Sequence, residues 1–221
     1  MAAKPASPAA LLRAAKRACQ DARDGRLDEP RLRELADAGE ALAVAACAQV
    51  SLFQGRHREA AGYAARYLRT PSPKATGNLF VDACAIVRAA GDEALTAEAA
   101  AGAYAVGTYA GLVEASLRTD RRERALLERA TRADAGDDEL LRRHEARSGL
   151  SDWSATLEVA FALLRAGDRA GAARALDADP RRWPAVDAGQ VVPVELATHP
   201  ALAGLWTPAR AAYWLASPRG R

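Results

Sequence analysis

The residue types that most often carry chemistry are few and scattered in this sequence. The three histidines and three cysteines do not lie at metal-ligand spacings, and neither an HExxH nor a CxxC motif occurs. The phosphate-binding GxxxxGK loop, the GxGxxG turn and the GxSxG nucleophile elbow are absent too. We therefore expect no catalytic residue, no cofactor and no metal, and a protein that is not an enzyme. The histidines are His57, His144 and His199.

The cysteines Cys19, Cys47 and Cys84 lie among alanines and leucines at helical spacing. A free cysteine in such surroundings usually packs as a small hydrophobic residue. We expect buried, reduced thiols, which indicate a reducing compartment and predict a cytoplasmic protein. The N-terminus also lacks the apolar core of a secretory signal.

A group of carboxylates surrounds Gly136, at Asp134, Asp137, Asp138 and Glu139. Their order does not match a calcium-binding loop, which needs ligands at alternating positions and a distal glutamate. Capping of a helix N-terminus by Asp137 or Asp138 is the favoured interpretation.

The arginines of residues 118–132 are the most suggestive cluster, because guanidinium groups can hold carboxylates or phosphates in bidentate fashion. We predict that they contact a partner, and that the partner is another protein with an acidic segment. A solvated face is the alternative, since Glu128 and Arg132 form a helical i,i+4 pair. Nucleic acid is a less favoured partner, because the net charge is only +3. The predicted partner-binding residues are Arg118, Arg121, Arg122, Arg124, Arg129 and Arg132.

The elements that must position these side chains are predicted to be helices. Alanine supplies about a quarter of the 221 residues, whereas aromatic residues make up 5%. Alanine has the highest helix propensity, so the composition predicts an all-α fold. Ser7 and Pro8 have the residue types of an N-cap and a first helical residue. The clearest helices are predicted at residues 8–23, 41–53, 58–69, 74–90 and 153–165, and only Val191, Val192 and Val194 resemble a strand.

One sequence pattern recurs where predicted helices meet. In it, a turn glycine is followed five residues later by alanine. Gly55 with Ala60 and Gly167 with Ala172 carry it most clearly. Glycine tolerates the left-handed turn at a helix C-terminus, and a small residue allows two helices to cross closely. This pattern resembles the tetratricopeptide repeats, although the turns are unevenly spaced and the family repeats at about 34 residues. The residues that match are Gly55, Ala60, Tyr63, Tyr67, Leu68 and Pro71, then Gly167, Ala172, Leu176 and Pro180.

The resemblance implies a solenoid of antiparallel helix pairs whose groove binds a partner, and an irregular helical bundle is the alternative fold. We expect residues 1–7 to form a disordered tail, residues 8–180 the helical-repeat domain, and residues 181–221 a cap on the same domain. The predicted function is a non-catalytic protein-interaction scaffold. A nucleic-acid-binding protein, or an enzyme or ligand carrier with a site near Trp183, Trp206, Tyr213 and Trp214, are the alternatives. A membrane helix within residues 94–113 is disfavoured, because alanine, glycine and threonine predominate there.

Overall fold

The computed structural model describes residues 7–70, 77–105, 136–138, 141 and 153–220. All regular structure within these ranges is helical, which confirms the predicted all-α class. The helices are α1 (Pro8–Arg23), α2 (Glu29–Asp37), α3 (Ala41–Phe53), α4 (His57–Leu68), α5 (Gly77–Ala89), α6 (Glu93–Ala105), α10 (Trp153–Arg165), α11 (Arg169–Asp177), α12 (Glu195–Thr198), α13 (Pro200–Ala203) and α14 (Pro208–Ala216), with a short 3₁₀ turn at Pro180–Arg182.

The helices begin and end at the local signals that the sequence carries. Ser7 caps α1 by accepting a hydrogen bond from the Ala10 N–H at 3.3 Å, and Pro8 is the first helical residue. Gly55 and Gly167 adopt φ values of +74° and +81° where α3 and α10 end. Such left-handed residues are readily accessible only to glycine. The predicted turns at these two glycines are therefore confirmed.

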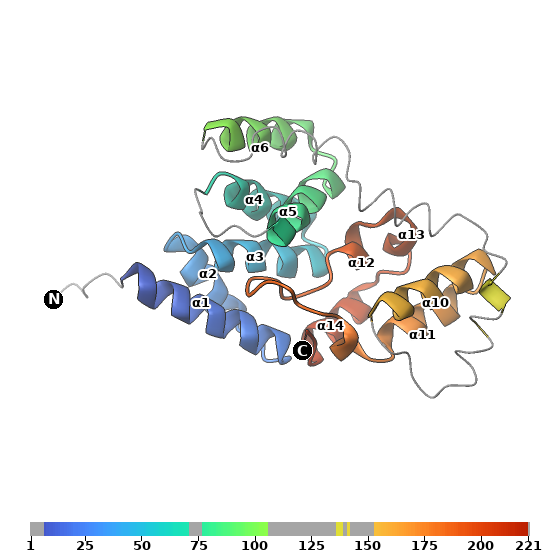
Figure 1. Ribbon diagram of the computed structural model, residues 1–221. Coiled ribbons are helices and arrows are strands. Elements are labelled where there is room, and N and C mark those ends of the chain that lie inside the picture. Colours follow the sequence, from blue (N-terminus) through green and yellow to red (C-terminus); the bar gives the residue numbers. More distant parts are fainter. Residues whose placement is uncertain (1–6, 71–76, 106–135, 139–140, 142–152, 221) are drawn as a thin grey trace.

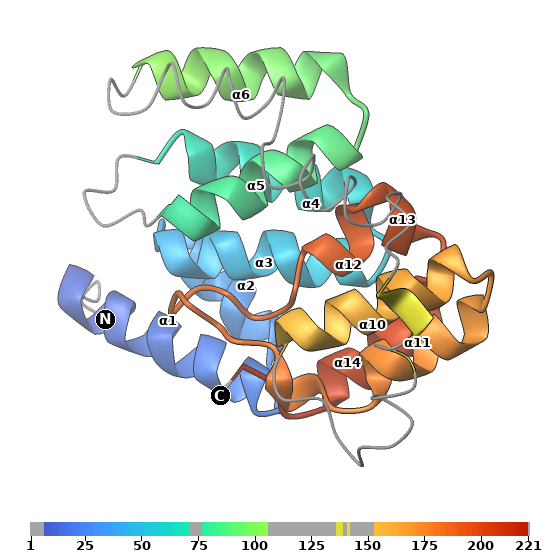
Figure 2. The same ribbon diagram turned by 45° about the vertical axis from the view of Figure 1, so that its right-hand side comes forward.

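Helices α1 to α6 form a stack in which neighbouring helices along the chain also pack together (Figures 1 and 2). In addition, α3 contacts both α1 and α5, and α4 contacts α6. Helix α3 lies inside this stack, and its residues from Ala43 to Phe53 are all buried. Its freedom from charged residues is what permits this burial on all sides.

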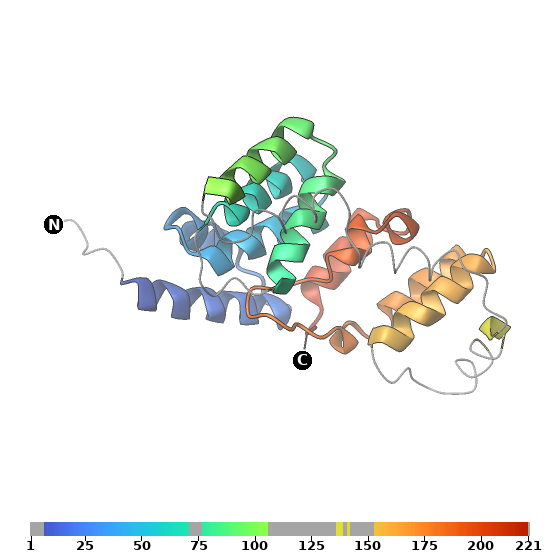
Figure 3. The ribbon, with the colours of Figure 1, turned by 45° about the horizontal axis from the view of Figure 1, so that its top comes forward.

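The C-terminal half of the chain lies beside this stack. Helices α10 and α11 form a pair, whereas α12 packs against α5 and α14 against α3. The chain returns to its first helix, because the last described residues lie near the C-terminal end of α1 (Figure 3). The Arg219 N–H donates to the Arg23 carbonyl oxygen at 2.7 Å. The last described residues thus close against the first helix.

Tryptophans join the two halves of the molecule. The rings of Trp206 and Phe53 lie 4.4 Å apart between centroids, and the indole N–H of Trp206 donates to the Phe53 carbonyl oxygen at 3.3 Å. Trp153 meets the fully buried Trp214 edge-on, with 5.9 Å between ring centroids. Residues near the C-terminus therefore belong to the same hydrophobic core as α3.

Candidate functional site

The arginine cluster predicted to bind a partner lies outside the described residues. Arg118, Arg121, Arg122, Arg124, Arg129 and Arg132 all fall within residues 106–135. Of the carboxylates around Gly136, Asp137 and Asp138 lie in the described part. Asp138 is exposed, and Asp137 receives two hydrogen bonds from Arg165, at 2.6 and 2.7 Å. This ion pair is largely shielded from solvent, so Asp137 is engaged in holding α10.

Another arginine-lined surface lies between α1 and the start of α2. A cleft of about 390 Å³ opens there. Ala14 and Ala18 of α1 contribute small side chains to it, which is why there is space between the longer ones. Its polar residues are Arg17, Asp21, Arg26, Asp28 and Arg31.

Both carboxylates of this cleft already have partners. Asp21 accepts a hydrogen bond from Arg26 at 2.7 Å, and this bond is the largest cause of the raised pKa of Arg26. Asp28 is the N-cap of α2 and accepts the Arg31 N–H at 3.0 Å. Local contacts thus hold both negative charges of the cleft in place.

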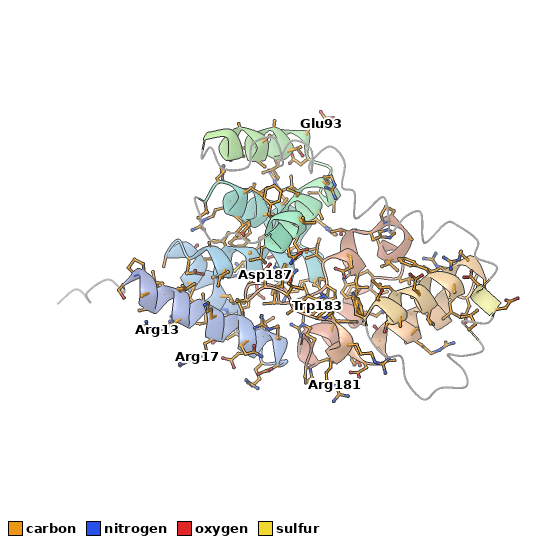
Figure 4. The ribbon with its side chains drawn as sticks, viewed as in Figure 1. Arg13, Arg17, Glu93, Arg181, Trp183 and Asp187 are labelled. Atoms are coloured by element: carbon orange, nitrogen blue, oxygen red, sulfur yellow. The ribbon has the colours of Figure 1, made fainter. Side chains whose placement is uncertain are left out.

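Arg26 binds both Asp21 and Asp24, whereas the other two arginines of the cleft, Arg17 and Arg31, are less fully engaged. Arg31 reaches Glu34 at 2.8 Å, but both side chains are at least half exposed, so the pair is weak. Within the described part of the chain, neither Arg17 nor Arg13 forms an ion pair with a carboxylate. Figure 4 shows Arg13 and Arg17 directed away from the body of the protein along one side of α1. The cleft therefore presents guanidinium groups to solvent.

The density of arginine in the sequence does not point to this surface. Residues 8–20 contain only three cationic residues, Arg13, Lys16 and Arg17, but they contain no acidic residue. The cluster at residues 118–132 has more arginines and is interleaved with glutamates. The absence of nearby carboxylates, rather than the count of cations, could have indicated α1.

The members of a second group of charged residues near α2 form ion pairs with one another. Arg33 and Arg56 both bind Glu29 and Glu59, at distances of 2.5 to 2.9 Å. Burial acts to raise the pKa of Glu29, but hydrogen bonds from Gln54 and Arg33 and the charge of Arg56 outweigh it and lower the pKa. This network fastens α2 to the start of α4 and has its charges balanced.

The faces of α1, α3 and α5 carry an irregular part of the same chain, residues 186–192, which we call the inner segment. Gln49 of α3 donates to the Gly189 carbonyl oxygen at 3.0 Å and accepts the N–H groups of Val191 and Val192 at 2.8 and 3.3 Å. Arg23 of α1 donates to the carbonyl oxygens of Ala188 and Gln190, both at 2.9 Å. Side chains of the helices therefore bond backbone groups of residues 188–192, whereas the N–H groups of Val186 and Asp187 are bonded by the Gln190 side chain within the segment.

The three cysteines and His199 take structural positions. Cys19, Cys47 and Cys84 are buried free thiols, which confirms the predicted burial. Burial raises the pKa of Cys19 and of Cys47 to about 12, so neither thiol is poised as a nucleophile. His199 is buried and caps α13, where its Nδ1 accepts the Ala201 N–H at 3.2 Å. Over the described ranges, histidines, cysteines and acidic residues form no group that could hold a metal ion.

The aromatic residues of the alternative site predicted near the C-terminus contact other parts of the protein. Trp183 and Trp214 are buried, and Trp206 is half-buried against Phe53. Tyr213 is 45% exposed and donates to the Asp177 carbonyl oxygen at 2.9 Å. None of the described helices is long and apolar enough to cross a membrane.

No protein-family model, curated protein or solved structure matches this chain. The resemblance to tetratricopeptide repeats thus stays a prediction from sequence.

Proposed function

We propose that this protein is a non-catalytic interaction module that holds an acidic segment of a partner protein in the cleft between α1 and α2. The observation that carries the proposal is the charge of this cleft. Its two carboxylates are engaged locally, whereas Arg17 projects into solvent without an ion pair in the described part of the chain. A carboxylate of a partner would supply the missing counter-charge.

Arginine suits this role because its planar guanidinium group binds a carboxylate through two parallel hydrogen bonds. It is also less strongly hydrated than the lysine ammonium group, so desolvation on binding costs less. Ala14 and Ala18 leave room for a side chain to enter between Arg17 and Arg31. An aspartate or glutamate side chain in an extended or helical segment fits a space of this kind.

The packing of α1 to α6 supports an interaction module more generally. Contacts between successive helices, together with those of α3 with α1 and α5 and of α4 with α6, are typical of stacked helix pairs. Proteins built in this way usually bind partners through the surfaces that their helices present. We extend the proposal to a helical-repeat architecture with antiparallel pairs, in line with the sequence patterns at Gly55 and Gly167.

A polypeptide partner is favoured over nucleic acid by the carboxylates within the cleft. Asp21 and Asp28 line it beside the arginines, and a continuous phosphate backbone would meet their negative charge. A discrete carboxylate can contact Arg17 and Arg31 while avoiding both aspartates.

The test is fluorescence anisotropy with a fluorescein-labelled peptide of alternating glutamate and alanine. The double variant Arg17→Glu/Arg31→Glu should bind this probe at least ten times more weakly than the wild type. Since an exposed ion pair contributes about 0.2–1 kcal/mol, losing two attractions and adding two repulsions accounts for a change of this size. Binding should also weaken as salt is added.

The matched control is Arg58→Glu/Arg174→Glu, which reverses the same number of charges at exposed positions of α4 and α11. This variant should bind the probe within a factor of about three of the wild type, because long-range charge effects are screened by salt. Equal losses in both variants would mean that net charge alone drives binding. Preferential binding of a labelled RNA oligonucleotide that also depends on Arg17 and Arg31 would replace the acidic protein with nucleic acid as the partner.

A further inference from the structure

We propose that the face formed by α1, α3 and α5 is a binding site for a peptide, and that in this structure the inner segment of the same chain occupies it. This proposal concerns a surface other than the cleft and does not depend on it. Its basis is that side chains from helices far away in sequence bond backbone groups of residues 188–192. The residues before them are held within the segment, by the Gln190 side chain and by a turn in which the Gln190 N–H donates to the Asp187 carbonyl oxygen at 3.0 Å.

Gln49 provides the central contact. Its side-chain amide donates to one carbonyl oxygen of the segment and accepts two N–H groups, at Gly189, Val191 and Val192. An amide that bonds main-chain donors and acceptors together reproduces part of what a neighbouring β-strand would offer. Backbone recognition of this kind is how proteins hold extended peptides.

Two other helices, α1 and α5, each contribute one side chain. From α1, Arg23 donates to the carbonyl oxygens of Ala188 and Gln190. From α5, Asp82 accepts a hydrogen bond from the Gln190 side chain at 2.7 Å. Side chains of three helices therefore bind one short segment. They contact the Gln190 side chain as well as the backbone.

Close packing defines what kind of peptide fits. A Cβ atom placed on Gly189 would lie 2.9 Å from Leu79 of α5 and 3.1 Å from Leu42 of α3, so the backbone approaches both leucines closely. Val191 and Val192 follow and are fully buried. The site thus selects a peptide with glycine, an amide side chain and two β-branched residues in succession.

The inner segment forms a turn but no helix or strand, and its residues 189–192 are buried in the site as a ligand would be. We infer that it can leave the site without unfolding the helices beneath it, because α3 also contacts both α1 and α5 directly. A second peptide with the same pattern could then bind, and the inner segment acts as a competitor built into the chain.

The first test is native-state hydrogen exchange on the wild-type full chain. If the segment opens on its own, the amides of Val191 and Val192 should exchange at least ten times faster than those in the middle of α3. Exchange of both groups at the same rate under all denaturant conditions would show that the segment opens only with the whole fold, and would overturn the proposal.

The second test measures binding in trans. The probe is a fluorescein-labelled peptide with the sequence of residues 184–194, and the control peptide carries Gly189→Leu. The full-length Gly189→Leu protein should bind the probe at least ten times more tightly than the wild type, since its own segment no longer fits. The control peptide should not bind.

The matched protein control is Gly62→Leu, because a Cβ atom at Gly62 meets nothing within 4 Å. It should bind the probe as weakly as the wild type. The proposal would be refuted if a folded Gly189→Leu protein did not bind the probe, or if it bound the probe and the control peptide equally well. Should Gly189→Leu fail to fold, the hydrogen-exchange result on the wild type decides.

Discussion

Replacement of Gln49 by methionine isolates the hydrogen bonds that hold the inner segment. Methionine has a similar volume and flexibility, so it fills the space of the side chain without leaving a large cavity. The Gln49 amide is buried and makes three hydrogen bonds to the segment. After Gln49→Met the carbonyl oxygen of Gly189 and the N–H groups of Val191 and Val192 lose these partners.

The expected loss follows from the cost of such orphaned groups. A buried donor or acceptor left without a partner costs about 1–3 kcal/mol. The 3.3 Å bond to Val192 is the weakest of the three. We therefore expect Gln49→Met to lower the free energy of unfolding by about 3–6 kcal/mol, a large part of the roughly 5–15 kcal/mol that a domain possesses.

The assay is urea unfolding followed by far-UV circular dichroism, with Gln54→Met as the matched control. Gln54 is exposed and makes one side-chain hydrogen bond, to Glu29 at 3.0 Å, so its replacement should cost less than about 0.5 kcal/mol. A loss below about 1 kcal/mol for Gln49→Met, with an unchanged dependence on urea, would refute the reasoning. The amide would then not be holding the segment.

Three further changes test the packing and the thiols. Gly25→Ala should destabilise the protein by about 2 kcal/mol more than Gly55→Ala. Both glycines have positive φ, but only Gly25 lacks space for a side chain. A Cβ atom at Gly25 would lie 2.5 Å from the Ala216 carbonyl oxygen, whereas one at Gly55 would meet no atom within 4 Å. Ala60→Leu should lower the melting temperature at a cost of about 1–3 kcal/mol, because Ala60 is fully buried. Cys19 and Cys47 have pKa values raised by burial from 9.0 to about 12. The unfolded chain releases these protons first, so stability should fall as pH rises from 9 to 12, by up to about 2.7 kcal/mol per pH unit, and Cys→Ala variants should flatten this decline.

Local signals were sufficient to predict most helices. The predicted range 8–23 matches α1, and 41–53 matches α3. Each is bounded by residues whose preferences do not depend on the rest of the fold, such as the Ser7 cap and the turn at Gly55. Helix ends can be found from sequence when capping and turn chemistry are local in this way.

The inner segment could not be placed from sequence, because its partners are remote. The valines near residue 191 resemble a strand in the sequence, but the hydrogen bond from Gln49 to Gly189 spans 140 residues. One signal is present in the sequence: Gln49 is an amide within a predicted helix, residues 41–53, that carries no charged residue. A buried amide needs hydrogen-bond partners, and so such a residue indicates a polar contact within the core.

Buried polar groups also explain why an arginine is buried in this core. Arg219 is 1% exposed and donates to the carbonyl oxygens of Val191, Trp214, Leu215 and Ser217. Desolvation lowers its pKa to about 10, so the charge is held at a cost. Buried carbonyl groups outside regular structure require donors, and a guanidinium group offers five in a fixed geometry. An arginine can therefore organise an irregular core segment, and composition alone cannot distinguish it from the exposed arginines that line the α1–α2 cleft.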